Sequence, residues 1–157
     1  MRAREILHEF KRGRDVKSSL GVGKTQRVRE WMETYAPGVE YEYTPGNDRL
    51  EIYGDLELIE QPSPGMKGPD VDIPADDVYV EGYLDVDNSD LTRLPRKLKV
   101  LGYLSVQRTG IDEWPEELYV QEGVYAGESG LGNRRKYLQA HGNPNITINK
   151  GINIKYF

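Results

Sequence analysis

Apolar and polar positions recur with a period of 20 residues through the middle of this chain, in segments that begin at Val71, Leu91 and Ile111. A fixed period in this range is typical of a solenoid, in which each coil buries its apolar edge against its neighbours. Such repeats form binding surfaces more often than catalytic pockets. The recurring positions are Val78/Leu98/Leu118, Val80/Val100/Val120, Leu84/Leu104/Val124, Val86/Val106/Ala126 and the hydroxyl residues Ser89/Thr109/Ser129.

Two helices are expected before the repeats. The first spans residues 3–11, and the second and stronger one spans residues 24–35 and ends at Pro37-Gly38. An open repeat end exposes its core, so a helix with an apolar stripe is the cap that it needs. The stripe at helical spacing consists of Val28, Trp31, Met32 and Tyr35.

From Val39 the apolar period changes from 3.6 to 2. Five residues fall on one face of a predicted strand. The same pattern returns 28 residues later, from Val78 to Val86, which indicates a further coil followed by an eight-residue insertion. The Pro- and Gly-rich stretch 61–70 is the expected site of that insertion. The five strand residues are Leu50, Ile52, Gly54, Leu56 and Leu58.

The last part of the chain departs from the 20-residue period. The basic run 134–136 begins a predicted short helix that continues to Ala140. Beyond it, isoleucines alternate on either side of residues 149–151, which predicts a terminal hairpin that closes the second end of the array. These isoleucines are Ile146, Ile148, Ile152 and Ile154.

The segment Leu101-Gly-Tyr-Leu104-Ser-Val106-Gln-Arg-Thr109-Gly-Ile111 fits the leucine-rich-repeat signature L-x-x-L-x-L-x-x-N-x-L, with threonine in place of asparagine. The following Trp114-Pro115-x-x-Leu118 resembles the L-P-x-x-L of short repeats in bacterial leucine-rich-repeat effectors. Resemblance covers residues 50–131. The whole order, a helix with a Trp, a β stretch and then such coils, is similar to short repeat proteins of tailed bacteriophages. That resemblance implies a phage-encoded protein in the cytoplasm of a bacterial host, and it implies no activity.

We therefore predict an α+β, mainly β fold, namely a short leucine-rich-repeat-like β-solenoid of about four coils. Residues 1–38 form an N-terminal helical cap, residues 39–133 the repeats, and residues 134–157 a C-terminal cap with the hairpin. All three parts belong to one compact unit. Trp114 replaces Leu94 in register and is predicted to lie in the core.

Composition excludes several classes of protein. The chain has no cysteine, which excludes disulfides and thiolate chemistry and is compatible with a reducing cytosol. We expect no membrane span and no secretory signal, because no segment is apolar for long enough. Residues 1–31 carry nine Lys or Arg against four Asp or Glu, whereas residues 40–90 carry fifteen acids against Arg49 and Lys67. Since aromatic residues are nearly absent from the basic head and the acidic body repels phosphates, we do not predict nucleic-acid binding.

Three features suggest chemistry, but each lacks a residue or a spacing that this chemistry requires. Residues 21–25 end in Gly-Lys-Thr, but Ser18 occupies the first glycine position of a phosphate-binding loop, and a helix N-terminus explains the motif as well. Residues 85–90 crowd oxygen ligands, but Arg96 stands where a calcium loop needs its glutamate. His8 and His141 have no metal-like or triad-like spacing. We predict no enzyme activity, no metal site and no cofactor.

The outward positions between the core residues are the candidate binding site. In register they form the rows Asp55/Tyr83/Tyr103/Gly123, Glu57/Asp85/Ser105/Tyr125 and Ile59/Asp87/Gln107/Gly127, about 4.8 Å apart along the stack. Tyrosines among acids and amides are typical of protein-recognition patches, although tyrosines also suit strands for packing alone, and both interpretations stay open. The predicted protein-binding residues are Tyr83, Asp85, Asp87, Tyr103, Gln107, Arg108 and Tyr125.

The leading hypothesis for function is a non-enzymatic, phage-encoded module that binds a host or virion protein through the sheet face. One alternative is a structural subunit of a virion or particle. Another is an acidic decoy or inhibitor of a nucleic-acid-binding host defence protein, which the acidic stretch 40–90 suggests. The sequence makes no prediction of the oligomeric state.

Overall fold

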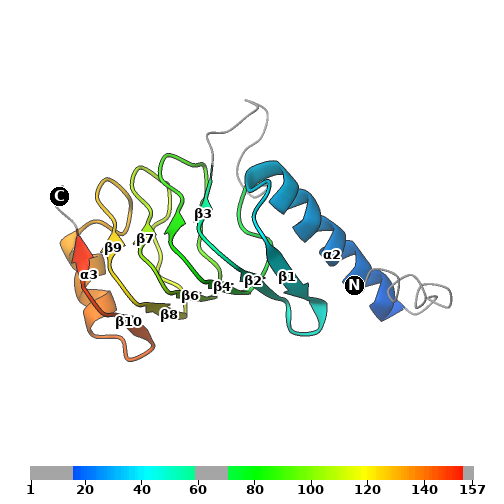
Figure 1. Ribbon diagram of the computed structural model, residues 1–157. Coiled ribbons are helices and arrows are strands. Elements are labelled where there is room, and N and C mark those ends of the chain that lie inside the picture. Colours follow the sequence, from blue (N-terminus) through cyan, green and yellow to red (C-terminus); the bar gives the residue numbers. More distant parts are fainter. Residues whose placement is uncertain (1–15, 59–70, 154–157) are drawn as a thin grey trace.

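A computed structural model describes residues 16–58 and 71–153 of the protein. This part is mixed α/β and consists mainly of strands, with two α-helices and two sheets (Figure 1). The helices are α2 (Val16–Tyr35) and α3 (Arg134–His141), with the 3-10 helix η1 (Pro45–Asn47). The first sheet has the order β1 (Tyr41–Thr44), β2 (Arg49–Ile52), β4 (Asp77–Val80), β6 (Lys97–Val100), β8 (Glu117–Val120), β10 (Ile146–Ile148). The second has the order β11 (Ile152–Asn153), β9 (Val124–Tyr125), β7 (Leu104–Ser105), β5 (Leu84–Asp85), β3 (Leu56–Glu57).

Successive segments of the chain supply one strand to each sheet, and like strands pair in parallel. In the first sheet Val80 pairs with Val100 and Val100 with Val120, and in the second Leu84 pairs with Leu104. The predicted 20-residue register is therefore confirmed. The 28-residue shift is confirmed as well, since Leu50 pairs with Val78.

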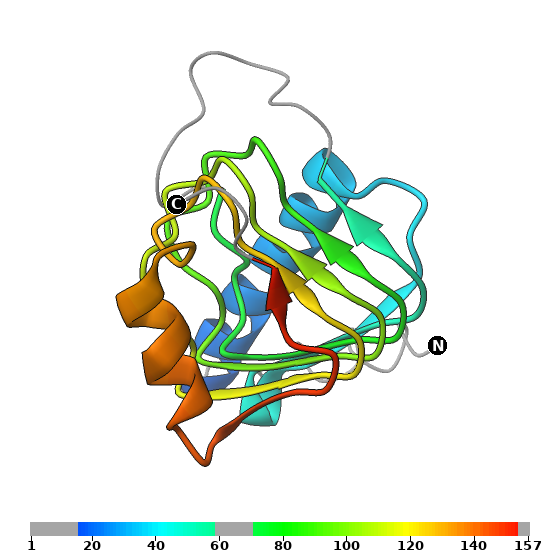
Figure 2. The same ribbon diagram turned by 90° about the vertical axis from the view of Figure 1, so that its left-hand side faces the viewer.

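The prediction of one continuous strand over residues 50–58 is wrong. Leu50 and Leu56 lie in different sheets, and the chain turns a corner between them at Gly54, which has a φ of +139°. Figure 2 shows the two sheets as two sides of the stack that meet along this corner. Inward-facing residues continue with period 2 through the corner, so the apolar pattern does not reveal the break.

Hydrogen bonds run across the corner from one repeat to the next. Gly82 N donates to Gly54 O (2.9 Å), Gly102 N to Gly82 O (2.8 Å) and Glu122 N to Gly102 O (3.2 Å). The glycine at 102 is needed by this close approach, because a Cβ there would lie 2.9 Å from the backbone of Gly82. The corner therefore continues the ladder that joins the repeats.

A third side carries the chain back without regular strands. The residues that begin the repeats are fully buried here: Val71, Leu91, Ile111 and Leu131. The hydroxyl positions make local bonds, and Ser129 Oγ donates to Ala126 O (2.8 Å) and accepts from Leu131 N (3.2 Å). Thr109 bonds to Val106 and Ile111 in the same way. Local turns thus take the place of an asparagine ladder.

Helix α2 packs against the first end of the strand stack. Its predicted stripe is buried, and Trp31 Nε1 donates a hydrogen bond to Val71 O (2.8 Å). The helix ends at Tyr35 as predicted, but it begins eight residues before the expected start at Lys24. The predicted helix 3–11 and insertion 61–70 lie outside the described residues. One hydrophobic cluster joins α2 to the buried residues of both sheets.

The second end of the stack corrects the predicted terminal hairpin. β10 and β11 do not pair with each other, since β10 pairs in parallel with β8 and β11 with β9. They repeat the preceding segment at a shift of 28 residues, with Gly151 at the corner and α3 in the connection. Alternating isoleucines fit a hairpin and a further repeat equally well, and Ile154 lies outside the described residues. The predicted helix from Arg134 is confirmed, and it extends to His141.

An antiparallel hairpin stands instead at the first end of the first sheet. β1 pairs with β2 through η1, which ends at Asp48 in the left-handed conformation, with a φ of +51°. The Asp48 carboxylate accepts a hydrogen bond from Tyr43 Oη (2.6 Å) and forms an ion pair with Lys24 Nζ (3.1 Å). This carboxylate therefore ties the hairpin to α2.

Candidate functional site

Three tyrosines from the second sheet and its corner lie side by side on the outward surface. The rings of Tyr83 and Tyr103 stack with centroids 4.7 Å apart and planes at 5°, and Tyr125 meets Tyr103 edge-on at 5.6 Å. The 20-residue register brings the first two rings into contact, and Tyr125 comes from the neighbouring row on β9. Together with Glu57 and Asp85 we call this surface the tyrosine face.

Carboxylates make the tyrosine face electronegative. Tyr83 Oη donates to Glu57 Oε1 (3.1 Å), and this bond raises the pKa of Tyr83. The pKa of Tyr103 is raised by partial burial first and then by the charges of Asp85 and Glu57. Partial burial also raises the pKa of Asp85. The raised pKa values keep the phenols of Tyr83 and Tyr103 neutral, so both remain hydrogen-bond donors at neutral pH.

Asp87 and Gln107 form hydrogen bonds with each other at the border of the tyrosine face. Asp87 Oδ1 accepts from Ser105 Oγ (2.7 Å) and Gln107 N (2.8 Å), and Oδ2 accepts from Gln107 Nε2 (3.3 Å). Ser105, which was expected to point outward, is buried. These side chains bond to neighbouring repeats and so stabilise the stack.

Arg108 lies at a second corner, where three residues share the left-handed conformation. Asn88, Arg108 and Glu128 have φ values of 61°, 55° and 61°. Arg108 Nε donates to Asn88 Oδ1 (2.7 Å), and its Nη1 pairs with Glu128 Oε1 (3.1 Å). Of the predicted site residues, the structure brings Tyr83, Asp85, Tyr103 and Tyr125 together, whereas Asp87, Gln107 and Arg108 serve inter-repeat bonding. Ile59, from the third predicted row, lies outside the described residues.

A recess of ≈ 670 Å³ adjoins the tyrosine face at its last strands. Tyr103 and Tyr125 belong to its lining, with their rings nearly perpendicular, and Glu122 and Lys150 are the charged residues of that lining. Main chain contributes to the lining as well, because Gly123 and Gly151 carry no side chain. The lining also includes Gly123, Val124, Gly151, Ile152 and Asn153.

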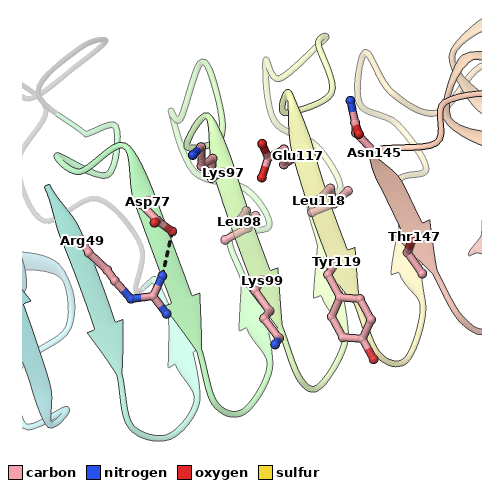
Figure 3. A pocket seen from close by; sticks show the side chains of 10 residues that line it. All are labelled: Arg49, Asp77, Lys97, Leu98, Lys99, Glu117, Leu118, Tyr119, Asn145 and Thr147. Carbon is pink, nitrogen blue, oxygen red and sulfur yellow. Dashed lines mark hydrogen bonds and ion pairs between the residues drawn. The ribbon is translucent and has the colours of Figure 1, made fainter. Parts of the chain in front are cut away.

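The outward face of the first sheet is a second surface, which the sequence analysis did not single out. It contains a shallow recess of ≈ 430 Å³ across β2 to β10 (Figure 3). Lys99 Nζ lies 5.4 Å from the Tyr119 ring centroid and 6.0 Å from that of Tyr79. Arg49 pairs with Asp77 (3.1 Å). Charges alternate in sign along the row Arg49, Asp77, Lys97 and Glu117.

The sequence carried the signal for this second surface. The outward positions before the corner follow the same 20-residue register. It places Lys97 beside Glu117 and Lys99 beside Tyr119. Because opposite charges compensate one another along the row, this face lacks the single-sign field of the tyrosine face. It is therefore the weaker candidate for a recognition surface.

The motifs that suggested chemistry have other roles in the described residues. Residues 21–25 lie inside α2 and not at its N-terminus, which corrects the expected capping role. Lys24 pairs with Asp48, and the His141 ring stacks on Tyr137 with centroids 5.5 Å apart. Within residues 16–58 and 71–153 no group of three or more His, Cys, Asp or Glu is placed to hold a metal ion.

The remaining findings concern the described chain and its comparison with known proteins. Among its helices, none combines the length and apolarity that crossing a membrane requires. The tyrosine face and its recess combine stacked aromatic rings, charged side chains and a hollow. Comparison with protein-family models, with curated proteins and with solved structures gave no match.

Proposed function

We propose that this protein is a non-enzymatic binding module that recognises a partner protein through the tyrosine face. The observation that carries the proposal is the contact of Tyr83, Tyr103 and Tyr125 across successive repeats. Tyrosine supplies a large, rigid contact area with a polar end, and it is enriched at the energetic centres of protein interfaces. Tyr125 remains 41% exposed, so a partner can cover it.

The scaffold that we propose for this face is a short leucine-rich-repeat-like solenoid. Parallel in-register pairing in both sheets and the fully buried row from Val71 to Leu131 support it. In a solenoid, each added repeat extends one flat surface by one strand spacing, which suits recognition of an extended protein segment. The resemblance to phage repeat proteins favours a host or virion protein as the partner.

Affinity capture from bacterial lysate, followed by mass spectrometry, tests the proposal. We expect the parent protein to retain a specific partner and the Tyr103→Ala/Tyr125→Ala variant to lose it. Tyr119→Ala is the matched control, because Tyr119 is an outward tyrosine of the first sheet. Retention of every partner by the double variant contradicts the proposal. Recovery of the chain alone, with higher assemblies in light scattering, would favour a structural subunit instead.

A further inference from the structure

The row of tyrosines stops before the stack of strands does. At the position directly after the corner residues Gly82 and Gly102, Tyr83 and Tyr103 are followed in register by Gly123 and Gly151. The strands continue, since Val124 N donates to Gly151 O (3.0 Å). The missing side chains leave the ≈ 670 Å³ recess beside Tyr103 and Tyr125. The surface therefore offers room for a planar group next to its own aromatic rings.

The charged residues on the recess lining indicate which chemical group of a partner fits there. Glu122 is exposed and makes no ion pair within the described residues. Asp85 on β5 and Glu57 on β3 carry further negative charge two and three strands away from β9. Lys150 is the cation on the recess lining, and it is the register neighbour of Glu122 on the far side. A cationic ligand is therefore attracted from the tyrosine side and repelled from the Lys150 side.

We propose that this recess receives an arginine side chain from the partner protein, an inference that rests on the proposed function. A guanidinium is planar, stacks on tyrosine rings and pairs with a carboxylate through two parallel hydrogen bonds. Tyr103 and Tyr125 on the recess lining provide the rings, and Glu122 provides the carboxylate. A lysine ammonium matches the charge but has no planar group to stack on a tyrosine ring, and a phenyl ring can stack but leaves Glu122 unpaired.

The partner segment runs across the strands toward the acidic end of the face. From the recess it passes Tyr103 and reaches Asp85 and Glu57, whose side chains lie on adjacent strands of the second sheet. Further basic residues on the segment would meet these acids. The inferred ligand is therefore an extended, arginine-bearing basic segment.

Titration with small probes tests the recess without knowledge of the partner. We would follow the amide signals of Gly123 and Gly151 by NMR while adding the amides of N-acetylarginine, N-acetyllysine or N-acetylphenylalanine. The arginine probe should shift both signals saturably and bind most tightly. Equal or tighter binding of the phenylalanine or lysine probe overturns the inference.

Charge variants test the direction of the interaction. Glu122→Gln should weaken the arginine probe about fivefold or more, whereas Glu117→Gln, on the first sheet, should leave its affinity unchanged. Lys150→Glu should strengthen binding because it replaces repulsion by attraction. An unchanged affinity in Glu122→Gln, or a weaker one in Lys150→Glu, overturns the inference.

A separate variant distinguishes failure of this inference from failure of the proposed function. Gly123→Tyr continues the tyrosine row and fills the recess while it keeps Tyr103 and Tyr125. If this variant still captures the partner that Tyr103→Ala/Tyr125→Ala loses, the tyrosine face binds but the recess does not. Because a Cβ at 123 would lie 3.2 Å from Gly151 O, Glu122→Lys, which changes no backbone contact, serves as the second test and should also lose the partner.

Discussion

At the residue scale, the charged form of Asp85 is destabilised by its position on the tyrosine face. Its pKa is raised mainly by partial burial, against which the hydrogen bond from Asp87 N (3.0 Å) acts, and the charges of Asp87 and Glu57 raise it further. The folded protein therefore holds the proton more tightly than the unfolded chain, in which an aspartate has a pKa of about 3.9. Stability is thus lost as the pH rises from that value through the folded pKa.

Asp85→Asn should therefore raise the melting temperature at pH 7. The asparagine carbonyl can still accept from Asp87 N, and no charge has to be held beside Glu57. The gain should disappear near pH 3, because Asp85 is then protonated in both the folded and the unfolded state. Melting curves of parent and variant at the two pH values measure this difference. A larger gain at pH 3 than at pH 7 would contradict the assigned cause.

At the scale of elements, the corner between the two sheets decides how closely repeats approach. Gly102→Ala places a Cβ 2.9 Å from backbone atoms of Gly82 and Tyr83, which cannot rotate away. We expect the free energy of unfolding to fall by about 1–3 kcal/mol, as for other overpacked sites. Urea unfolding gives this value.

Gly23→Ala is the matched control for the corner variant. Gly23 lies within α2, and apart from its chain neighbours and the backbone of that helix no described atom lies within 4 Å of a Cβ at that position. The same substitution should there raise the free energy of unfolding by up to about 1 kcal/mol, because alanine favours the helix. Equal effects of the two alanines would show that the corner is not close-packed.

Periodicity carries different amounts of information about different elements. The register that pairs Leu84 with Leu104 was predictable because parallel neighbours bury equivalent residues. The corner at Gly54 was not, since inward alternation continues through it. Local alternation also did not separate a hairpin from a further repeat around Gly151. The 28-residue shift from Gly123 to Gly151 was the signal that distinguishes them, and the same shift relates Leu50 to Val78.

The positions of the candidate site residues were predictable from the register, but the contacts of their side chains were not. Sequence placed Tyr83 and Tyr103 in one row, and the structure stacks their rings. It could not show that Asp87 bonds to Ser105, because side-chain direction at a strand end depends on the neighbouring repeat. The recess beside Tyr125 needed the three-dimensional path of β11. Absent side chains at Gly123 and Gly151 define a hollow only once the strands are known to continue.

At the scale of the whole molecule, one core joins the two ends of the stack. The chain has two tryptophans, Trp31 in α2 and Trp114, whose Nε1 donates to Lys136 O (2.8 Å) in α3. They report on opposite ends, and Leu104 lies fully buried between them. Repeat arrays can unfold from one end, because each unit contacts only its neighbours. In this protein the short stack and the shared hydrophobic cluster favour a single transition instead.

We predict that both ends unfold together and that Leu104→Ala moves both transitions equally. Removing this buried side chain should cost about 2–5 kcal/mol, a large part of the roughly 5–15 kcal/mol that stabilises a domain. Trp114→Phe and Trp31→Phe each leave one tryptophan, so urea unfolding followed by fluorescence reports each end separately. Coincident midpoints, shifted alike by Leu104→Ala, indicate one cooperative unit. A shift confined to one tryptophan would show that α2 and the last strands are energetically separate, and a partner bound at the tyrosine face would then stabilise only its own end.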